Sequence, residues 1–308
     1  MRTTKVTSVT CMQDNRPGDR QSRVIASYAI AVSPASCYFV AYDDLDLRRI
    51  AESGQCFRFT ALAQDEGAYR IIHQGECLVI SPVDRTGQYR CNCSEETFQR
   101  IWRPYFDLNE DYTAIRSRIS PESDPYLYAA MQAQSGIRIL RQEPFETLIS
   151  FIISQNRNIP AIRSSIELLC DMCGEERSSG GEVFRAFPKP EAISRMTEQD
   201  LQSCRLGYRV PYVLEAARAV ADGRLDLQAL TSADPDTALR ELTSLYGVGT
   251  KVASCVALFG LHQLNVFPMD VWIRRVLQEH YPDGFPFDNY SPYCGVYQQY
   301  LFAHARND

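Results

Sequence analysis

The spacing of hydrophobic residues along the chain changes near residue 95. Before this point, short apolar runs are separated by polar turns that contain glycine, a pattern typical of antiparallel strands. The strands are predicted at residues 36–42, 55–59, 69–73, 77–81 and 88–93. After residue 95, apolar residues recur at intervals of three and four, which predicts helices through to the end of the chain. The whole pattern predicts an α+β protein, with an antiparallel β domain at 28–125 and a helical region at 126–308.

The first residues of the chain differ from both regions. Residues 1–27 are mostly polar, and the run Asn-Arg-Pro-Gly-Asp-Arg at 15–20 is rich in residues that favour turns. A segment with so little apolar surface cannot repay the entropy cost of ordering its backbone. We therefore expect residues 1–27 to be disordered or loosely ordered.

A strongly amphipathic helix is predicted to begin at Pro144, because proline is favoured in the first turn of a helix. The apolar residues that follow at i, i+3, i+4, i+7 and i+8 are Phe145, Leu148, Ile149, Ile152 and Ile153. We interpret this stripe as core. The polar segment 154–158 ends the helix before Pro160 opens the next one, and its amides and arginine are of the kind that reach base edges or a phosphate.

Two further helices are predicted on either side of the glycines in residues 245–251, Leu-Tyr-Gly-Val-Gly-Thr-Lys. The apolar residues with helical spacing are Leu239, Leu242 and Tyr246 before the turn, and Val252, Cys255, Val256 and Phe259 after it. We place this helical hairpin at about 236–261. A glycine turn that opens a helix presents free N–H groups, from Gly247, Gly249 and their neighbours, to an anion such as a DNA phosphate.

Two residues near this hairpin carry candidate chemistry. Lys251 lies in the first turn of the second helix, where a cation opposes the helix dipole, and this favours the neutral, nucleophilic amine. Asp270 lies just before another apolar helical run and is expected to be its N-cap. Taken singly, a helical lysine is usually solvated and such an aspartate is usually only a cap. The joint pattern with its fixed spacing indicates function.

Length and composition limit the class of protein. At 308 residues, with 45% hydrophobic and 23% charged residues, the chain is long enough for two globular domains. The formal net charge of −6 argues against a nucleic-acid partner, because phosphates bind positive charge. The objection is weak, since phosphate binding depends on where positive charges lie and not on the overall charge. The most apolar early stretch, 28–42, is interrupted by Ser33 and Pro34 and is too short to span a bilayer. No membrane association is expected.

The eleven cysteines are scattered along the chain. Their odd number, with no signal peptide ahead of them, predicts an intracellular protein with reduced thiols. Cys91 and Cys93 alternate along a predicted strand, and no histidine or second cysteine pair is spaced to complete a metal site around them. We interpret both as buried packing residues and expect no metal site.

The run Tyr-Gly-Val-Gly-Thr-Lys-Val-Ala-Ser-Cys at 246–255, followed by Val-Phe-Pro-Met-Asp-Val at 266–271, resembles the helix-hairpin-helix DNA glycosylases that have a Gly/Pro-rich loop and an Asp. Within that superfamily the chain most resembles the 8-oxoguanine DNA glycosylases. The similarity covers about 270 residues, from near Cys37 to the end. Further similar stretches are GQCFRF at 54–59, GIRILRQEP at 136–144, LGYR at 206–209 and QQYLF at 298–302. The resemblance implies an antiparallel β domain joined to two helical subdomains, with the DNA groove between them.

The resemblance also implies an activity: a bifunctional glycosylase and abasic-site lyase that excises 8-oxoguanine from double-stranded DNA. Lys251 would attack C1′ as the base leaves, forming a Schiff base that permits β-elimination. Asp270 would stabilise positive charge at C1′. A monomer without cofactors is expected. Cys294 is the only cysteine after Asp270, so the iron–sulfur cluster of some relatives is not expected.

The resemblance assigns further residues to the base and to the DNA. The Gly54 carbonyl would accept the N7 hydrogen that oxidation creates, Cys255 and Phe302 would stack on the flipped base, and Gln298 would read its Watson–Crick edge. The residues expected to contact DNA are Asn156, Arg157, Tyr208, Arg209, Gly247, Gly249 and Trp272. Two departures stand out: Ala161 replaces an arginine of the eukaryotic enzymes, and Trp272 replaces their usual histidine.

Two other readings stay open at this point. A related glycosylase could act on an oxidised pyrimidine or an alkylated purine, although alkylpurine enzymes generally lack the lysine. A helix-hairpin-helix module could bind DNA without catalysis, which explains the glycines but not Lys251 together with Asp270. The short turns suggest a bacterial or archaeal family member, which would act in the cytoplasm or nucleoid, whereas a eukaryotic member would act in the nucleus.

Overall fold

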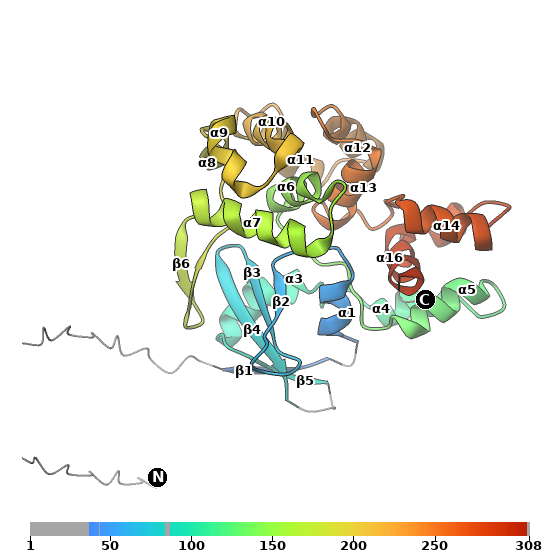
Figure 1. Cartoon of the computed structure of the whole chain (residues 1–308). Coiled ribbons are helices and arrows are strands. Elements are labelled where there is room, and N and C mark those ends of the chain that lie inside the picture. The colour runs from blue at the N-terminus through green and yellow to red at the C-terminus, as the bar shows by residue number, and fades with distance from the viewer. Residues whose placement is uncertain (1–36, 43, 84–86, 307–308) are drawn as a thin grey trace, which may run out of the picture. The chain divides into compact units, whose positions relative to one another are not determined.

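The computed structural model describes residues 37–42, 44–83 and 87–306, which lie in one unit spanning 34–308. The tail predicted at 1–27 lies outside the described residues, as does the start of the predicted β domain. The described chain begins with a five-stranded antiparallel sheet of strand order β1-β5-β4-β3-β2 (Figure 1). Its strands are β1 (Tyr38–Ala41), β2 (Phe59–Ala61), β3 (Tyr69–His73), β4 (Glu76–Pro82) and β5 (Gln88–Cys91).

Four of the five predicted strands are confirmed in place, but the one predicted at 55–59 is wrong. Residues 53–58 form bends, and β2 starts only at Phe59. The physical reason is Gln55, which is fully buried and uses its side chain to bond the backbone of Arg138 and Leu140 instead of joining a strand ladder. A short helix, α1 (Leu47–Glu52), precedes these bends and was not predicted.

Helices make up most of the chain after β5 (Figure 1). The short early ones are α2 (Glu95–Thr97), the π-helical η1 (Phe98–Trp102), α3 (Arg103–Tyr105), α4 (Tyr112–Ser117) and α5 (Pro125–Ala133). The middle ones are α6 (Pro144–Ser154), α7 (Ile159–Cys173), α8 (Pro190–Ser194), α9 (Glu198–Leu201), the 3₁₀ turns η2 (Gln202–Cys204) and η3 (Gly207–Arg209), and α10 (Val210–Ala221). The last are α11 (Leu227–Leu230), α12 (Pro235–Thr243), α13 (Thr250–Phe259), α14 (Val271–His280), α15 (Phe287–Tyr290) and α16 (Cys294–Ala305).

The helical core forms around α6 and α13, which pack against each other. The predicted stripe of α6 is confirmed. Leu148, Ile149, Ile152 and Ile153 are fully buried, and the partly buried Phe145 packs against the same cluster. In α13 every residue from Val252 to Phe259 is buried. No helix among the described residues combines the length and the apolar character needed to cross a bilayer.

The prediction that the chain remains helical after residue 95 is wrong at one place. A second sheet, of β6 (Glu176–Ser179) and β7 (Glu182–Arg185), forms an antiparallel hairpin after α7. Its turn is Gly180-Gly181, a pair that favours hairpins, but the strands are too short and too exposed to show a clear alternation in the sequence. Arg58 ties this hairpin to the fold by donating to the Arg185 carbonyl at 2.7 Å and pairing with Glu167 of α7 at 2.8 Å.

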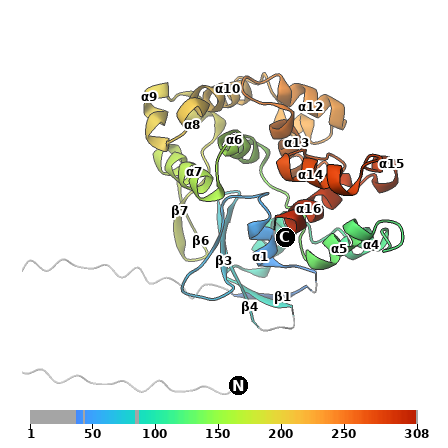
Figure 2. The ribbon, with the colours of Figure 1, turned by 45° about the vertical axis from the view of Figure 1, so that its right-hand side comes forward.

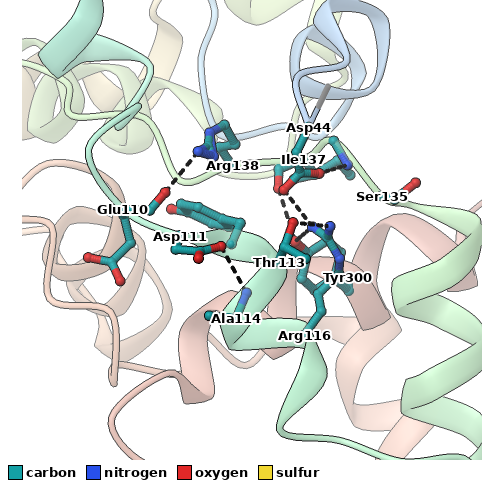
Figure 3. A network of polar contacts seen from close by, with 12 residues as sticks. Asp44, Glu110, Asp111, Thr113, Ala114, Arg116, Ser135, Ile137, Arg138 and Tyr300 are labelled. Carbon is teal, nitrogen blue, oxygen red and sulfur yellow. Dashed lines mark hydrogen bonds and ion pairs between the residues drawn. The ribbon is translucent and has the colours of Figure 1, made fainter. Parts of the chain in front are cut away.

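The last helix, α16, lies between α14 and α5 (Figures 1 and 2). A polar network joins it to the first part of the chain (Figure 3). Tyr300 donates its hydroxyl to the Ile137 carbonyl at 3.1 Å, and Arg116 reaches both the Tyr300 hydroxyl at 3.3 Å and Asp44 at 2.9 Å. These buried bonds fix the rotation of α16 about its axis, and therefore the direction of its other side chains.

Glu146, in the first turn of α6, lines a cavity of about 430 Å³ between the β3–β4 turn and the residues after β7. Burial raises the pKa of its carboxyl to about 7, and the charge of Arg58 opposes this only in part. A carboxyl whose folded pKa exceeds its unfolded value stabilises the fold at low pH and loses that contribution as pH rises through 7.

We therefore expect Glu146→Gln to be more stable than the wild type at pH 8 and to lose that advantage near pH 5. Urea denaturation midpoints at both pH values measure this. Glu241→Gln, which changes an exposed carboxylate on α12, is the matched control and should show the same small difference at both pH values. A stability difference for Glu146→Gln that does not change with pH would contradict the assignment.

Candidate active site

The turn between α12 and α13 brings a helix start to the surface. Gly247 has a φ of +83°, and a Cβ at this position would lie 2.1 Å from Cγ of Tyr212, so the turn requires glycine. Gly249 is the N-cap of α13, no side chain caps the helix, and nothing lies within 4 Å of where its Cβ would be. The N–H groups of the first turn are thus open to an anion.

One detail of the predicted hairpin is wrong. The first helix ends at Thr243, so Tyr246 lies beyond it and is 63% exposed instead of joining the apolar face with Leu242. Its ring packs edge-on against Tyr212, with centroids 4.9 Å apart, because Tyr212 occupies the space over Gly247. The turn residues 244–249 separate the two helices and interrupt the helical spacing there.

The loop after α6 lies beside this turn. Gln155 donates to the Gly247 carbonyl at 3.1 Å, and exposed Asn156, with a φ of +52°, donates to the Tyr208 hydroxyl at 3.2 Å. Arg209 is buried, and its guanidinium donates from Nε to the Gln155 carbonyl at 2.9 Å. The structure thus brings Asn156, Tyr208, Gly247 and Gly249 around one open depression, with Arg209 supporting it from behind.

A second cavity, of about 520 Å³, lies beside the first and contains the candidate catalytic pair. Lys251 is exposed in the first turn of α13, with its Nζ 5.3 Å from the ring centroid of Phe151. Asp270 is the N-cap of α14, as predicted, and accepts a hydrogen bond from the Ile273 N–H at 2.9 Å. No ion pair joins Lys251 to Asp270 in the described part of the chain, so neither side chain is neutralised by the other.

The opposite wall of this cavity comes from the other end of the sequence. Gly54 follows α1, and Phe302 of α16 packs against it, since a Cβ on Gly54 would meet the Phe302 ring at 3.6 Å. Trp272 and Arg157 also line the cavity, and Trp272 is 39% exposed. Arg157 is not free, because its Nη1 donates to the Ser165 hydroxyl at 2.8 Å.

Two predicted base-binding residues lie outside the cavity wall. Cys255 is buried one turn after Lys251, and burial raises the pKa of its thiol. Gln298 is also buried; its Nε2 donates to the Pro268 carbonyl at 3.1 Å, while its Oε1 is buried and has no partner among the described residues. A buried amide oxygen without a donor is costly, and it is the kind of group that a ligand satisfies.

Arg306 also lines the cavity and was missed by the sequence analysis. Its guanidinium lies 5.3 Å from the ring centroid of Phe302 and donates to the Glu52 carbonyl at 3.3 Å. The available signal was its position four residues after Phe302, on the same side of the last helix. Among the described residues that line the cavity, Arg157, Lys251 and Arg306 are cationic and Asp270 is anionic, a local excess of two positive charges. The overall charge of −6 therefore does not describe this surface.

Across the described ranges, no group of three or more His, Cys, Asp or Glu side chains is arranged to hold a metal ion. Cys91 and Cys93 are buried in the core of the sheet region, which agrees with the packing role predicted for them. The ionisable groups that line the cavity of Lys251 are its amine, the Asp270 carboxylate and the guanidinium groups of Arg157 and Arg306, whereas tyrosine hydroxyls line the depression beside the hairpin.

Gly247→Ala should displace the hairpin turn, because the added Cβ collides with the Tyr212 ring in a backbone conformation that alanine avoids. We expect a lower melting temperature and weaker binding to duplex DNA, measured by fluorescence anisotropy. The control is Gly249→Ala, whose Cβ would enter open space at an ordinary φ of −89°, so it should lower the melting temperature much less, by the poorer N-capping of alanine alone. Equal melting temperatures for both variants would contradict the steric account.

Two family models match the chain. The model described as 8-oxoguanine DNA glycosylase, N-terminal domain, matches residues 38–148. The model described as HhH-GPD superfamily base excision DNA repair protein matches residues 149–284. A probable N-glycosylase/DNA lyase of Methanothermobacter thermautotrophicus is 30% identical over 302 residues, which cover 85% of this chain and 94% of the relative.

Solved structures are similar over nearly the same length. MBOgg1 in complex with a low-affinity DNA ligand has a TM-score of 0.81 and 34% identity, covering 88% of this chain and 96% of that one. The Clostridium acetobutylicum 8-oxoguanine glycosylase/lyase, in complex with double-stranded DNA containing cytosine opposite 8-oxoguanine, has a TM-score of 0.78 and 32% identity. That similarity covers 86% of this chain and 92% of the Clostridium protein.

Proposed function

Because this chain belongs to the 8-oxoguanine DNA glycosylase family of the HhH-GPD superfamily, it is a DNA N-glycosylase with abasic-site lyase activity, and we propose that the cavity with Lys251 and Asp270 is its active site. Its substrate is 8-oxoguanine in duplex DNA. One observation carries the assignment of the site: an exposed amine and a carboxylate share a cavity without pairing to each other, opposite Gly54 and Phe302.

DNA binding is proposed to begin at the open depression beside the hairpin. The free N–H groups at the start of α13 would bind a backbone phosphate and set the register without reading sequence. The adjoining cavity then receives the damaged nucleotide, because the sugar C1′ is inaccessible while its base remains stacked. The positive charge of Arg157, Lys251 and Arg306 supports binding of the backbone near this cavity.

The proposed reaction uses Lys251 as nucleophile. Its uncharged amine forms a bond to C1′ while the bond from C1′ to the base breaks, and the departing base takes up a proton. Opening of the sugar ring converts the adduct to an imine, which acidifies the hydrogens on C2′ and permits elimination of the 3′ phosphate. The Asp270 carboxylate stabilises positive charge developing at C1′. Its position as the N-cap of α14 holds it in place for this role.

Recognition of the base is proposed for the opposite wall. Oxidation at C8 changes N7 of guanine from acceptor to N–H donor, so a carbonyl aimed at N7 favours the damaged base. Gly54 would supply that carbonyl, with the base stacked between Cys255 and Phe302. The unpartnered Oε1 of Gln298 supports a role in binding the Watson–Crick edge. Because Cys255 and Gln298 are buried in this structure, base entry would require the wall to open.

The residues around the hairpin depression are proposed to act on the rest of the duplex. Exposed Asn156 and Tyr208, joined by a hydrogen bond, would contact the base left opposite the lesion. Arg209 would act by holding the Gln155 carbonyl and so the shape of this loop. Arg157 and Trp272 would contact DNA at the rim of the active-site cavity. Ala161 lies at the start of α7, in the place of an arginine in the eukaryotic enzymes, so we expect less strict discrimination for cytosine opposite the lesion.

We further propose that the enzyme is a monomer and needs no cofactor. It would act on DNA in the nucleoid of a prokaryote or in the nucleus of a eukaryote. The chemistry requires an amine and a carboxylate, and this chain supplies both. The single cysteine after Asp270, Cys294, cannot hold an iron–sulfur cluster alone, and its thiol bonds the Phe287 carbonyl at 3.3 Å.

Lys251→Gln should abolish covalent trapping, because an amide cannot form an imine with the opened sugar. The measurement is a gel assay of duplex DNA carrying one 8-oxoguanine, incubated with enzyme and borohydride. The wild type should give an adduct and the variant none. An undiminished adduct with the variant would overturn the role of Lys251. Trapping only on a different lesion would select a related glycosylase, and binding without trapping on any lesion would select a non-catalytic module.

Asp270→Asn should retain DNA affinity and lose turnover by roughly 100- to 1000-fold, the usual effect of removing one electrostatic stabiliser. Asparagine can still accept the N-cap bond from Ile273, so the fold should persist. Single-turnover excision rates and anisotropy binding curves separate the two effects. Full activity in this variant would remove Asp270 from the mechanism.

A further inference from the structure

The residues around Gly54 are held by hydrogen bonds from several parts of the chain. Among the donors, Gln299 of α16 has no part in the proposed chemistry. We infer that Gln299 is a positioning residue that holds the Gly54 carbonyl in the direction needed to accept the N7 hydrogen of 8-oxoguanine. The inference rests on the proposed function of the cavity. Gln299 is not part of the cavity wall, so it acts on the base through Gly54.

The first contact is on the N-terminal side of Gly54. Gln299 is 2% exposed, and its Nε2 donates to the Ser53 carbonyl at 2.8 Å. That carbonyl belongs to the planar peptide group that includes the Gly54 nitrogen. Holding the Ser53 oxygen therefore holds the peptide plane that leads into Gly54.

The residue on the C-terminal side is held as well. Gln55 is fully buried, and its side chain donates to the Arg138 carbonyl at 2.9 Å and accepts from the Leu140 N–H at 2.8 Å. Its own carbonyl accepts from Gln142 Nε2 at 2.7 Å. These bonds hold the chain directly after Gly54. Before it, the Ser53 N–H and hydroxyl both donate to the Ile50 carbonyl, at 3.3 and 2.7 Å, and Gln55 Nε2 donates to the Ser53 hydroxyl at 3.0 Å. Among the described residues, Gln299 is the one that bonds the Ser53 carbonyl, the oxygen of the peptide plane that enters Gly54.

The Gly54 carbonyl itself accepts no hydrogen bond from any of the residues that the structure describes. Glycine at a φ of +77° also has a backbone with little intrinsic preference for one conformation. The direction of this carbonyl therefore has to come from its neighbours. A half-buried carbonyl that is left open, yet held in one direction, suits a ligand that brings its own N–H donor.

The geometry of α16 explains how one helix both bonds the segment before Gly54 and carries residues proposed to contact the base. Gln298 and Gln299 are adjacent and so point about 100° apart, one toward the Pro268 carbonyl and the other toward Ser53. Phe302 follows Gln299 by three residues, which places it on the same face, against Gly54. Tyr300 anchors the helix between them through the Ile137 carbonyl (Figure 3). A change at Gln299 therefore releases the Ser53 carbonyl without removing the residues proposed to contact the base.

The test compares wild type with Gln299→Met, which keeps side-chain length and removes the donor. Three duplexes are used, carrying 8-oxoguanine, its 7-deaza analogue without the N7 hydrogen, or a preformed abasic site. We expect kcat/KM for 8-oxoguanine to fall roughly 10- to 100-fold, the scale of a small misplacement in an active site. The rate on the 7-deaza analogue and the abasic-site lyase rate, which do not use that hydrogen, should stay within about twofold.

The matched control is Gln263→Met. Gln263 also donates an amide to buried carbonyls, those of Leu230 and Ala233, at 3.1 Å each, but it lies outside the active-site cavity. It should leave the ratio between 8-oxoguanine and the 7-deaza analogue unchanged. A wild-type ratio in Gln299→Met, or a parallel loss of lyase activity, would overturn the positioning role. A wild type that cleaves abasic sites but does not excise 8-oxoguanine would instead overturn the proposed function.

Discussion

The burial of α13 is the constraint on which the proposed active site depends. Every residue from Val252 to Phe259 is buried, so hydrophobic packing fixes both the position and the rotation of this helix. Only its first turn reaches the surface, and that turn contains Lys251 and the uncapped N–H groups. The same packing thus places the proposed nucleophile and the proposed phosphate-binding turn a few residues apart, and a change in the core would displace both.

The second wall of the cavity depends on hydrogen bonds rather than on apolar packing. The bends at residues 53–58 are held by buried amide side chains, and α16 contributes both Phe302 and a bond to the Ser53 carbonyl. Directional bonds suit this wall, because a carbonyl that distinguishes N–H from a lone pair must keep its direction. The two walls therefore have different proposed roles. In the proposed mechanism, one wall supplies the reacting groups from a rigid helix, and the other recognises the base through an irregular segment that is bonded from several sides.

Local patterns predicted well wherever one segment determines its own structure. The α6 stripe and the N-cap role of Asp270 follow from periodicity and capping, which act over a few residues. The failures have a common cause. The spacing at residues 55–59 predicts a strand, but the Gln55 side chain bonds the backbone of distant residues instead. Tyr246 fits the helical spacing of Leu239 and Leu242, but the helix ends at Thr243 and a turn follows. In the β6–β7 hairpin, the strands are too short for a reliable pattern.

The sequence by itself predicted the family, the glycosylase/lyase activity and the proposed catalytic pair, because the hairpin motif and the aspartate that follows it are close together in the chain. Only the tertiary structure decided which residues lie behind the cavity wall, that Arg306 belongs to it, and how Gly54 is held. Those features depend on contacts between residues far apart in sequence, such as the 246 positions that separate Ser53 from Gln299. No local pattern encodes such a pairing, because it exists only once the two ends of the fold have packed together.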